Sequence, residues 1–228
     1  MTTYLRPTPW DKRNFHIDTY EVTSLTEDAL KETDQYEGHY TIKVSPLKDT
    51  ELLYRYGFYY METMIEPVCK KEDLQIMEHD GVTISKDYVK EDVLAIAETV
   101  FENGRFHRDF HIPSSMADKR FMNWVRDLQE KDLIIALYYK GDLAGFFGYE
   151  GDNVLLLAMK ETYRGMGLTQ AFTSKCCQYQ FDLGYERLRT SISAANLPSL
   201  NVFIRLGFKL RDTTDVYHKL TGPAPEES

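Results

Sequence analysis

The spacing of hydrophobic positions changes repeatedly along the chain between an alternating pattern and a helical one, which predicts a mixture of strands and helices. Over the first 65 residues the pattern predicts a β-α-β-α-β unit, with Gly57 as the cap that ends its second helix. Residues 1–8 are polar or rich in proline and are expected to fray. The expected strands cover 15–22, 39–44 and 58–65, and the expected helices cover 27–36 and 48–56.

A charged stretch at 69–92 contains no long apolar period and is expected to be a linker. After it, the pattern predicts two helices, a three-stranded antiparallel meander and then two helix–strand pairs. These helices are expected at 91–103, 115–129, 165–183 and 198–206, and the strands at 132–139, 143–149, 154–159, 187–193 and 216–220. The whole chain is therefore expected to form an α/β fold with a mixed sheet flanked by helices.

Two seven-residue segments, LLYRYGF at 52–58 and VFIRLGF at 202–208, share one pattern and lie 150 residues apart. Any amphipathic helix that precedes a strand can end in this way. The alternative is that the N-terminal unit is a degenerate partial copy of the C-terminal domain. We expect an N-terminal domain over 1–80, a C-terminal domain over 81–220 and a disordered tail at 221–228.

Composition narrows the class of protein. With 228 residues, 43% of them hydrophobic and 28% charged, the chain has the balance of an ordinary globular protein with a sizeable core. Its longest apolar run, at 154–159, is far shorter than the ~20 residues of a membrane-spanning helix. The N-terminus also lacks the apolar core of a secretion signal, so we expect a cytoplasmic location and no membrane partner.

Charge and cysteine usage exclude further classes. The formal net charge of −9 argues against a broad basic surface and hence against a nucleic-acid partner. An anionic ligand would have to be held locally, by the amides of a helix N-terminus or by a few basic side chains. Cys69, Cys176 and Cys177 are odd in number and two are adjacent, which suits neither a disulfide framework nor a zinc site. Reduced thiols and no metal are therefore expected.

The most informative segment for chemistry is 155–169, in which Arg164-Gly165-Met166-Gly167 follows a strand and a turn and opens a long helix. Glycines let backbone N–H groups approach phosphate oxygens, and a helix N-terminus adds partial positive charge. These features favour a pyrophosphate site, although a glycine pair at such a junction can also be only a tight connection. The spacing fits neither the dinucleotide-binding signature nor the P-loop.

The run from Met159 through Gly167 resembles the acyl-CoA pyrophosphate loop of the GNAT superfamily of N-acetyltransferases. That loop has Arg or Gln, two residues, Gly, one residue, then Gly or Ala, and Thr169 departs from it at the last position. A second element, Asn196 to Phe208, resembles the segment that flanks the CoA arm in the superfamily. The resemblance implies a splayed, mixed sheet and acetyl-CoA as co-substrate. It implies CoA contacts from Met159, Arg164, Gly165, Met166, Gly167, Leu168, Thr169, Asn196 and Phe203.

A third segment narrows the resemblance. Residues 101–109, FENGRFHRD, followed by Asp118 and Trp124, are similar to the GNAT subgroup that acetylates nucleotide-linked amino-deoxysugars, typified by dTDP-fucosamine acetyltransferase. That subgroup carries a partial GNAT-like N-terminal domain, which would account for the two echoed segments.

Arg105, Asp109 and Tyr149 are the expected acceptor-binding residues. The guanidinium of Arg105 could clamp a phosphate bidentately, or it could only form a surface ion pair with Asp109 or Asp118. Tyr149 lies on a central strand that the superfamily uses as the floor of the acceptor site, where a sugar or a base can stack.

Acetyl transfer requires removal of a proton from the acceptor ammonium and return of a proton to the departing thiolate. Glu150 and either His107 or Asp109 are candidate bases, although a strand-end Glu is often only solvated and a His beside an Asp is often only hydrogen-bonded. In many GNAT members a tyrosine supplies the acid. Phe203 stands at that position here, and Tyr217 is a candidate substitute.

The resemblance therefore implies an acetyl-CoA-dependent N-acetyltransferase whose acceptor is a small-molecule amine, foremost a nucleotide-linked amino sugar. Two alternatives stay open: a GNAT enzyme that acts on a protein N-terminus, a polyamine or an antibiotic, and a non-catalytic CoA-binding protein, which Phe203 favours. An exposed edge strand in the last hairpin would permit a homodimer.

Overall fold

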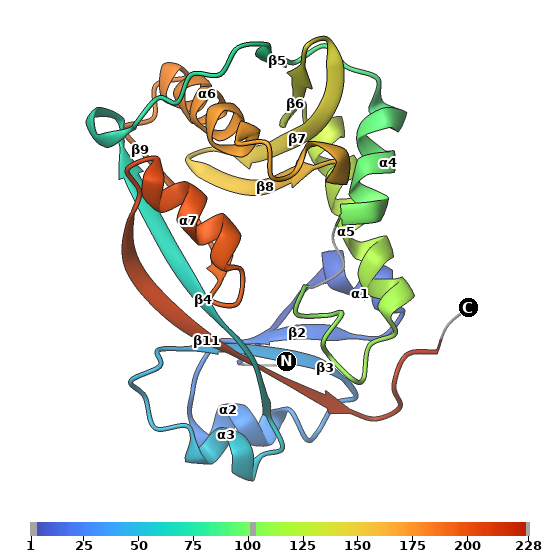
Figure 1. The fold of residues 1–228 in the computed structure, drawn as a ribbon. Coiled ribbons are helices and arrows are strands. Elements are labelled where there is room, and N and C mark those ends of the chain that lie inside the picture. The colour runs from blue at the N-terminus through green and yellow to red at the C-terminus, as the bar shows by residue number, and fades with distance from the viewer. Residues whose placement is uncertain (1–3, 101–103, 227–228) are drawn as a thin grey trace. The chain divides into compact units, whose positions relative to one another are not determined.

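Figure 1 shows the computed structural model of this chain, which describes residues 4–100 and 104–226. The chain divides into two compact units that interleave along the sequence. Unit 1 comprises Met1–Met64, Glu102–Arg120 and Thr213–Ser228, and unit 2 comprises Ile65–Phe101 and Phe121–Asp212. The expected domains, 1–80 and 81–220, are consecutive instead, and these ranges stay a prediction. Residues 101–103, the start of the expected motif FENGRFHRD, lie outside the described residues.

Unit 1 is built on a small mixed sheet with the strand order β1-β2-β3-β11-β4. β2 and β3 run parallel, whereas β3 and β11 run antiparallel. Leu30, Tyr40 and Leu53 are completely buried in its core. The elements are β1 (Leu5–Pro7), α1 (Pro9–Phe15), β2 (Thr19–Val22), α2 (Glu27–Glu32), β3 (Gly38–Val44), α3 (Glu51–Arg55), the first half of β4 (Tyr59–Lys70) and most of β11 (Lys209–Thr221).

Two expectations for the N-terminus are wrong. Residues 5–7 are not frayed, because this segment pairs antiparallel with β2 and places Leu5 opposite Val22. Phe15 does not begin a strand but ends α1, a helix that Pro9 starts with the φ angle a first helical turn requires. Phe15 is completely buried. The hydrophobic pattern therefore located a core residue correctly and assigned it to the wrong type of element.

Unit 2 carries a longer sheet with the strand order β4-β9-β8-β7-β6-β5, and β10 pairs with β4. Strands β6 to β8 form an antiparallel meander, β5 pairs antiparallel with β6, and β8 pairs parallel with β9. The expected linker at 69–92 is wrong in part, because Val82–Ser85 forms strand β5 along β6. The elements are η1 (Lys71–Asp73), β5, α4 (Lys90–Val100), α5 (Ser114–Glu130, shared with unit 1), β6 (Ile134–Tyr139), β7 (Asp142–Glu150), β8 (Asn153–Met159), η2 (Glu161–Tyr163), α6 (Leu168–Asp182), β9 (Arg187–Thr190), β10 (Ile192–Ser193) and α7 (Leu197–Arg205).

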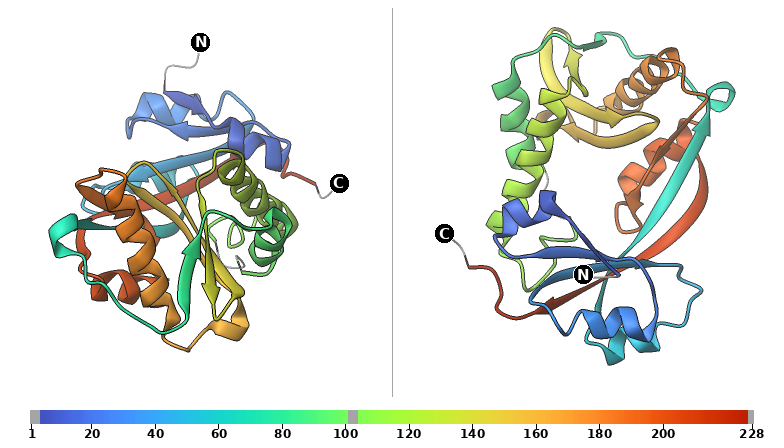
Figure 2. Two further views of the ribbon diagram at one scale, coloured as in Figure 1. Left: turned by 90° about the horizontal axis from the view of Figure 1, so that it is seen from above. Right: turned by 180° about the vertical axis from the view of Figure 1, so that it is seen from behind.

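Helices cover both faces of the part of the sheet formed by β5 to β8 (Figures 1 and 2). Successive side chains of a strand point to opposite faces, and the neighbours Phe146 and Phe147 of β7 accordingly enter different cores. Phe146 joins a cluster that includes Val93 of α4 and Val125 of α5. Phe147 joins a second cluster, which includes Phe172 of α6. Burial on both faces explains why β7 is apolar at nearly every position.

The two units exchange the strands that end their β-α-β segments. β4 follows α3 of unit 1 in the chain, and its residues 68–70 pair antiparallel with β9 in unit 2. β11 follows α7 of unit 2, and its residues 215–221 pair antiparallel with β3 in unit 1. β11 therefore lies inside its sheet, between β3 and β4. The edge-strand argument for a homodimer is thus wrong, and the homodimer itself stays a prediction.

The echoed segments at 52–58 and 202–208 have the same local structure. In each, the N–H of the final phenylalanine donates to the carbonyl five residues earlier, at 2.9 Å in the first segment and 3.1 Å in the second. Gly57 and Gly207 have φ angles of +77° and +94°, the left-handed conformation that a glycine supplies after a helix. This local agreement, together with the exchanged strands, supports the partial-copy hypothesis.

Two further expectations concern membrane-spanning helices and the state of the cysteines. No helix among the described residues is long and apolar enough to cross a membrane. Cys69, Cys176 and Cys177 are all buried free thiols, as expected. Burial raises the pKa of the Cys69 thiol to about 11, so this thiol is protonated near neutral pH.

Candidate functional site

The expected anion-binding loop connects β8 to α6 in unit 2. After β8 ends at Met159, the short turn η2 leads to Arg164, whose backbone is extended. Gly165 and Gly167 follow with φ angles of +76° and +77°, and a Cβ at either position would meet no atom within 4 Å. Glycine is thus required here by backbone conformation, and the space beside the loop backbone is open.

Helix α6 begins directly after this loop. Gly167 is its N-cap, and within the described residues the first turn has neither a side-chain cap nor an acidic residue. The first amides of this 15-residue helix therefore keep their hydrogen-bonding capacity and their partial positive charge. Leu168 is completely buried and anchors the start of the helix, whereas Met166 is exposed and Thr169 half-buried. Such a helix start can bind a phosphate group.

The sheet is splayed where it approaches the loop. β8 pairs with β7 along its whole length but with β9 only at Asn153 and Val154. Among the described residues, 155–159 therefore has no strand partner on its second edge. Arg164 Nε donates to the Met159 carbonyl at 3.3 Å, which ties the loop to the end of the strand. The splayed sheet implied by the resemblance is present.

Asn196 and Phe203, which are expected to contact CoA, both contribute to the structure of α7. Asn196 is the N-cap of this helix, and its side-chain oxygen accepts a hydrogen bond from the Ser199 N–H at 3.2 Å. The Phe203 side chain is buried and packs edge-on against Phe208, with the ring centroids 4.9 Å apart. These contacts explain how α7 starts and packs, and a CoA contact of either residue stays a prediction.

Tyr149 and Glu150 end β7 in unit 2. Burial, and then a hydrogen bond with Tyr179, raises the pKa of the Tyr149 hydroxyl. Glu150 is exposed and forms an ion pair with Lys131, at 2.9 Å between Oε1 and Nζ. The Glu150 carboxylate is accessible to solvent, because its side chain is exposed in this ion pair. Exposed ion pairs of this kind contribute little to stability. Its role as a base stays a prediction.

His107 and Tyr217 lie in unit 1. His107 Nδ1 accepts from the Gly104 N–H at 3.2 Å, and its Nε2 donates to Asp118 Oδ1 at 2.9 Å. The Tyr217 side chain is buried, and burial followed by a hydrogen bond with Tyr54 raises the pKa of its hydroxyl. The structure thus distributes the three expected catalytic residues over both units, with Glu150 in unit 2.

Arg105 lies in unit 1 with its guanidinium carbon 4.8 Å from the ring centroid of Phe106. Its ion-pair partner is Glu62, at 3.9 Å, and not Asp109 or Asp118, the partners in the alternative interpretation of this residue. Burial lowers the pKa of Arg105. Its Nε is buried and has no hydrogen-bond partner among the described residues. Arg105 therefore keeps one donor that these residues do not satisfy.

Asp109 is the centre of a buried cluster that sequence reasoning missed. Its Oδ2 accepts hydrogen bonds from His39 Nε2 at 2.9 Å and from His218 Nδ1 at 2.7 Å. Its Oδ1 accepts from the Tyr59 hydroxyl at 2.9 Å and from the His111 backbone N–H at 3.0 Å. The Asp109 side chain is 0% exposed, so these four donors replace its hydration completely.

The hydrogen bonds of this cluster decide its charge state. Burial alone would raise the pKa of Asp109, but the hydrogen bonds from His218 and His39 outweigh burial and hold that pKa well below its usual range. Burial lowers the pKa of His218 to about 3, so its imidazole is neutral at neutral pH. The two histidines are 70 and 109 residues from Asp109 in sequence. No local pattern could therefore have indicated the cluster.

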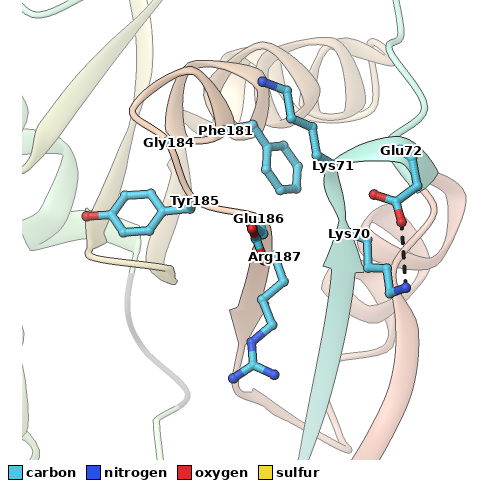
Figure 3. A pocket seen from close by; sticks show the side chains of 8 residues that line it. All are labelled: Lys70, Lys71, Glu72, Phe181, Gly184, Tyr185, Glu186 and Arg187. Carbon is cyan, nitrogen blue, oxygen red and sulfur yellow. Dashed lines mark ion pairs between the residues drawn. The ribbon is translucent and has the colours of Figure 1, made fainter.

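A pocket of about 500 Å³ lies at the C-terminal end of α6 (Figure 3). Lys70 and Glu72 form an ion pair on one side of it, at 3.6 Å. Because a helix rises about 1.5 Å per residue, the length of α6 separates this pocket from the Gly167 loop by about 20 Å. The pocket is lined by Lys70, Lys71, Glu72, Phe181, Gly184, Tyr185, Glu186 and Arg187, none of which was an expected site residue.

Residues 92–208 match the model of the acetyltransferase (GNAT) family. The matched range contains β8, the glycine loop, α6 and α7. Among curated proteins, none matches this chain.

Solved structures share the fold. A GCN5-related N-acetyltransferase from Sphaerobacter thermophilus has a TM-score of 0.67 and 11% identity, over 98% of this chain and 78% of that one. A functionally unknown conserved protein from Staphylococcus epidermidis has a TM-score of 0.64 and 12% identity, over 93% and 89%. A GCN5-related N-acetyltransferase from Kribbella flavida has a TM-score of 0.59 and 13% identity, over 90% and 82%. This likeness confirms the expected α/β fold with a mixed, open sheet flanked by helices.

Proposed function

This chain belongs to the acetyltransferase (GNAT) family of acetyl-CoA-dependent acyltransferases, and we propose that it acetylates an amine of a nucleotide-linked amino-deoxysugar. The open N-terminus of α6 behind Arg164 and the two glycines is the observation that carries the donor half of the proposal. Two things support the acceptor half: the similarity of segment 101–109 to the sugar-nucleotide subgroup, and the spare donor capacity of Arg105.

The proposed donor site fits the CoA pyrophosphate. The amides at the start of α6 and the Arg164 guanidinium would hold its oxygens, while Gly165 and Gly167 keep the loop backbone accessible. The free edge of β8 at Met159 offers backbone groups to the pantetheine arm. Met166, Leu168 and Thr169 complete the proposed loop, and Asn196 and Phe203 are the proposed contacts from α7.

When bound, acetyl-CoA supplies the thioester that the amine attacks. The chain has to remove a proton from the acceptor ammonium, stabilise the oxyanion and return a proton to the thiolate. A backbone N–H of β8 near Met159 is the proposed oxyanion donor, and Glu150 or His107 is the proposed base. Because Phe203 carries no hydroxyl, Tyr217 is the proposed acid, and its raised pKa keeps that hydroxyl protonated at neutral pH.

The proposed acceptor residues differ in what they can do. Arg105 can offer two parallel N–H donors to a phosphate of the sugar nucleotide. Tyr149 offers a ring on a central strand. The Asp109 carboxylate is enclosed by its four donors, so its proposed contribution is to position the turn that carries Arg105.

Calorimetric titration with acetyl-CoA tests the donor site. We expect Gly167→Val to weaken binding by at least about 100-fold, or about 2.7 kcal/mol, because a β-branched side chain both strains the loop and fills the space beside it. Gly184→Val is the matched control: Gly184 also has a left-handed φ and open surroundings, but it lies at the other end of α6. Undiminished binding by Gly167→Val would contradict the donor site.

An acceptor panel tests the substrate class. The full-length protein with acetyl-CoA would be offered a nucleotide-linked amino-deoxysugar, the same amino sugar without its nucleotide, a polyamine, an aminoglycoside and a peptide N-terminus. We expect transfer, followed by CoA release and product mass, only to the nucleotide-linked sugar. Arg105→Gln should raise KM for that substrate. Faster transfer to the free sugar, polyamine, antibiotic or peptide would assign another acceptor class.

The two candidate bases can be separated by the pH dependence of kcat/KM. The variant that removes the base, Glu150→Gln or His107→Gln, should lose the acidic limb of the profile, because that limb reports protonation of the base in the free enzyme. The other variant should keep the limb. Retention of the limb in both variants would exclude both residues.

A further inference from the structure

Unit 1 brings two imidazoles and one carboxylate together. The ligand atoms of His39, Asp109 and His218 all lie within 4.8 Å of one another, and all three residues are buried. His39 comes from β3, His218 from β11 and Asp109 from the turn that precedes α5. The site therefore joins three segments that are distant in sequence.

The sheet register explains why the histidines meet. In the antiparallel β3–β11 pair, Leu220 lies opposite His39 and Thr41 lies opposite His218. The two histidines are thus diagonal neighbours on one face of the sheet, since side chains alternate between faces. Their ring centroids are 4.6 Å apart, and the rings are edge-on at 78°. The Oδ2 atom of Asp109 contacts the Nε2 of His39 and the Nδ1 of His218.

Without an ion, two protons occupy the centre of this cluster. Both imidazole nitrogens contact the same oxygen, at 2.9 and 2.7 Å, so each of them has to carry its proton. A divalent ion would take the place of those protons and use the two imidazole lone pairs and the carboxylate. Tetrahedral zinc, with bonds of about 2.0–2.1 Å, separates its ligands by about 3.3–3.4 Å. The two distances would therefore have to open by only about 0.4–0.7 Å.

The surroundings already hold the three ligands in place. The second oxygen of Asp109 accepts from the Tyr59 hydroxyl and the His111 N–H, which fixes the carboxylate plane. The ring of Phe106 stacks on His218 at 5.1 Å and 25°. A third imidazole nitrogen, His111 Nδ1, contacts the Tyr59 hydroxyl at 2.9 Å and lies 3.7 Å from Asp109 Oδ1, the oxygen that does not contact the two histidines. A site with oriented ligands loses little conformational entropy when an ion enters.

We propose that His39, Asp109 and His218 bind a divalent transition-metal ion. Two imidazoles and a carboxylate match the ligand preference of Zn²⁺. Because the three ligands are buried, the site is structural: it links β3, β11 and the turn before α5. The proposal does not depend on the acceptor or on acetyl transfer.

Zinc titration of the metal-stripped, full-length protein tests the site. We expect one Zn²⁺ per chain and a higher Tm with zinc, since a ligand bound only by the folded state stabilises it. His218→Gln should weaken zinc binding by more than about 100-fold, because even supporting residues cost about 10- to 100-fold. Tyr59→Phe should weaken it by about tenfold. His79→Gln, which removes a histidine of unit 2, is the matched control and should bind as the parent does.

Two results would overturn the proposal. Either no zinc binding by the parent or equal binding by His218→Gln would leave the cluster as a hydrogen-bond network only. Should His218→Gln fail to fold, a zinc-soaked crystal of the parent decides instead. An anomalous peak in contact with all three ligand atoms supports the site, and a peak elsewhere or no peak overturns it.

Discussion

Each unit places a helix directly after the first strand of a parallel pair, and the two helices begin in opposite ways. In unit 1, α2 follows β2, its N-cap Thr26 accepts a hydrogen bond from the Ala29 N–H, and its first turn carries Glu27 and Asp28. In unit 2, α6 follows β8 and starts at Gly167 with no side-chain cap and no acidic residue in its first turn.

The difference shows that, within one topology, the amides at a helix N-terminus can be either used by the chain itself or left available to an anion. In α2 a hydroxyl and two carboxylates of the chain itself use the free amides and the positive end of the helix dipole, and they would repel an anionic ligand. In α6 the same groups are left for a ligand. A few residues at the helix start therefore decide whether a β-α-β unit, original or copy, can hold a pyrophosphate.

The two helix-ending glycines give the largest expected contrast between the units. A Cβ on Gly207 would lie 2.1 Å from the Asp73 carbonyl oxygen, whereas a Cβ on Gly57 would meet nothing within 4 Å. Gly57→Ala should cost about 1–2 kcal/mol for its left-handed conformation. Gly207→Ala should cost about 2–5 kcal/mol, because displacement of the Asp73 backbone is added. Denaturant unfolding measures both, and equal losses would show that the contact with Asp73 is relieved without cost.

Giving α6 the acidic start of α2 should reduce CoA binding. Thr169 is the second residue of α6, as Asp28 is of α2. We expect Thr169→Asp to weaken acetyl-CoA binding by about tenfold through repulsion of the pyrophosphate. The same change should stabilise the helix by about 0.3–1 kcal/mol. Thr169→Asn, equal in size and uncharged, is the control. Calorimetry and thermal unfolding would show these opposite signs, and unchanged affinity in Thr169→Asp would place the pyrophosphate elsewhere.

Removing the cap of α2 should have the smallest effect. The Ala29 N–H donates to the Thr26 hydroxyl at 3.4 Å, a long hydrogen bond. Thr26→Ala should therefore cost about 0.5–1 kcal/mol of unfolding free energy, and Thr26→Ser should cost less. Acetyl-CoA affinity should be the same in both variants, because α2 is not part of the proposed donor site. A loss of affinity in Thr26→Ala would break the contrast between the two helix starts.

Features that depend only on interactions between residues close in sequence were predicted well. The glycine loop before α6, the echoed segments and the meander of β6 to β8 follow from glycine conformation and hydrophobic spacing over a few residues. Elements that depend on a partner were missed. β5 has only four residues and no apolar run of its own, and it is a strand because β6 offers it a hydrogen-bonding edge. β1 was also not predicted, because it is a strand only through its pairing with β2.

By itself, the sequence determined the fold class and the loop that points to acetyl-CoA, because both are encoded in contiguous residues. Only the tertiary structure decided which strands pair across the exchange and which side chains share a site. Asp109 meets His39 and His218 because β11 returns to pair with β3, and no interaction between sequence neighbours encodes that pairing. Burial then makes the contacts of Asp109 strong, since a carboxylate removed from water has to be satisfied entirely by the groups that surround it.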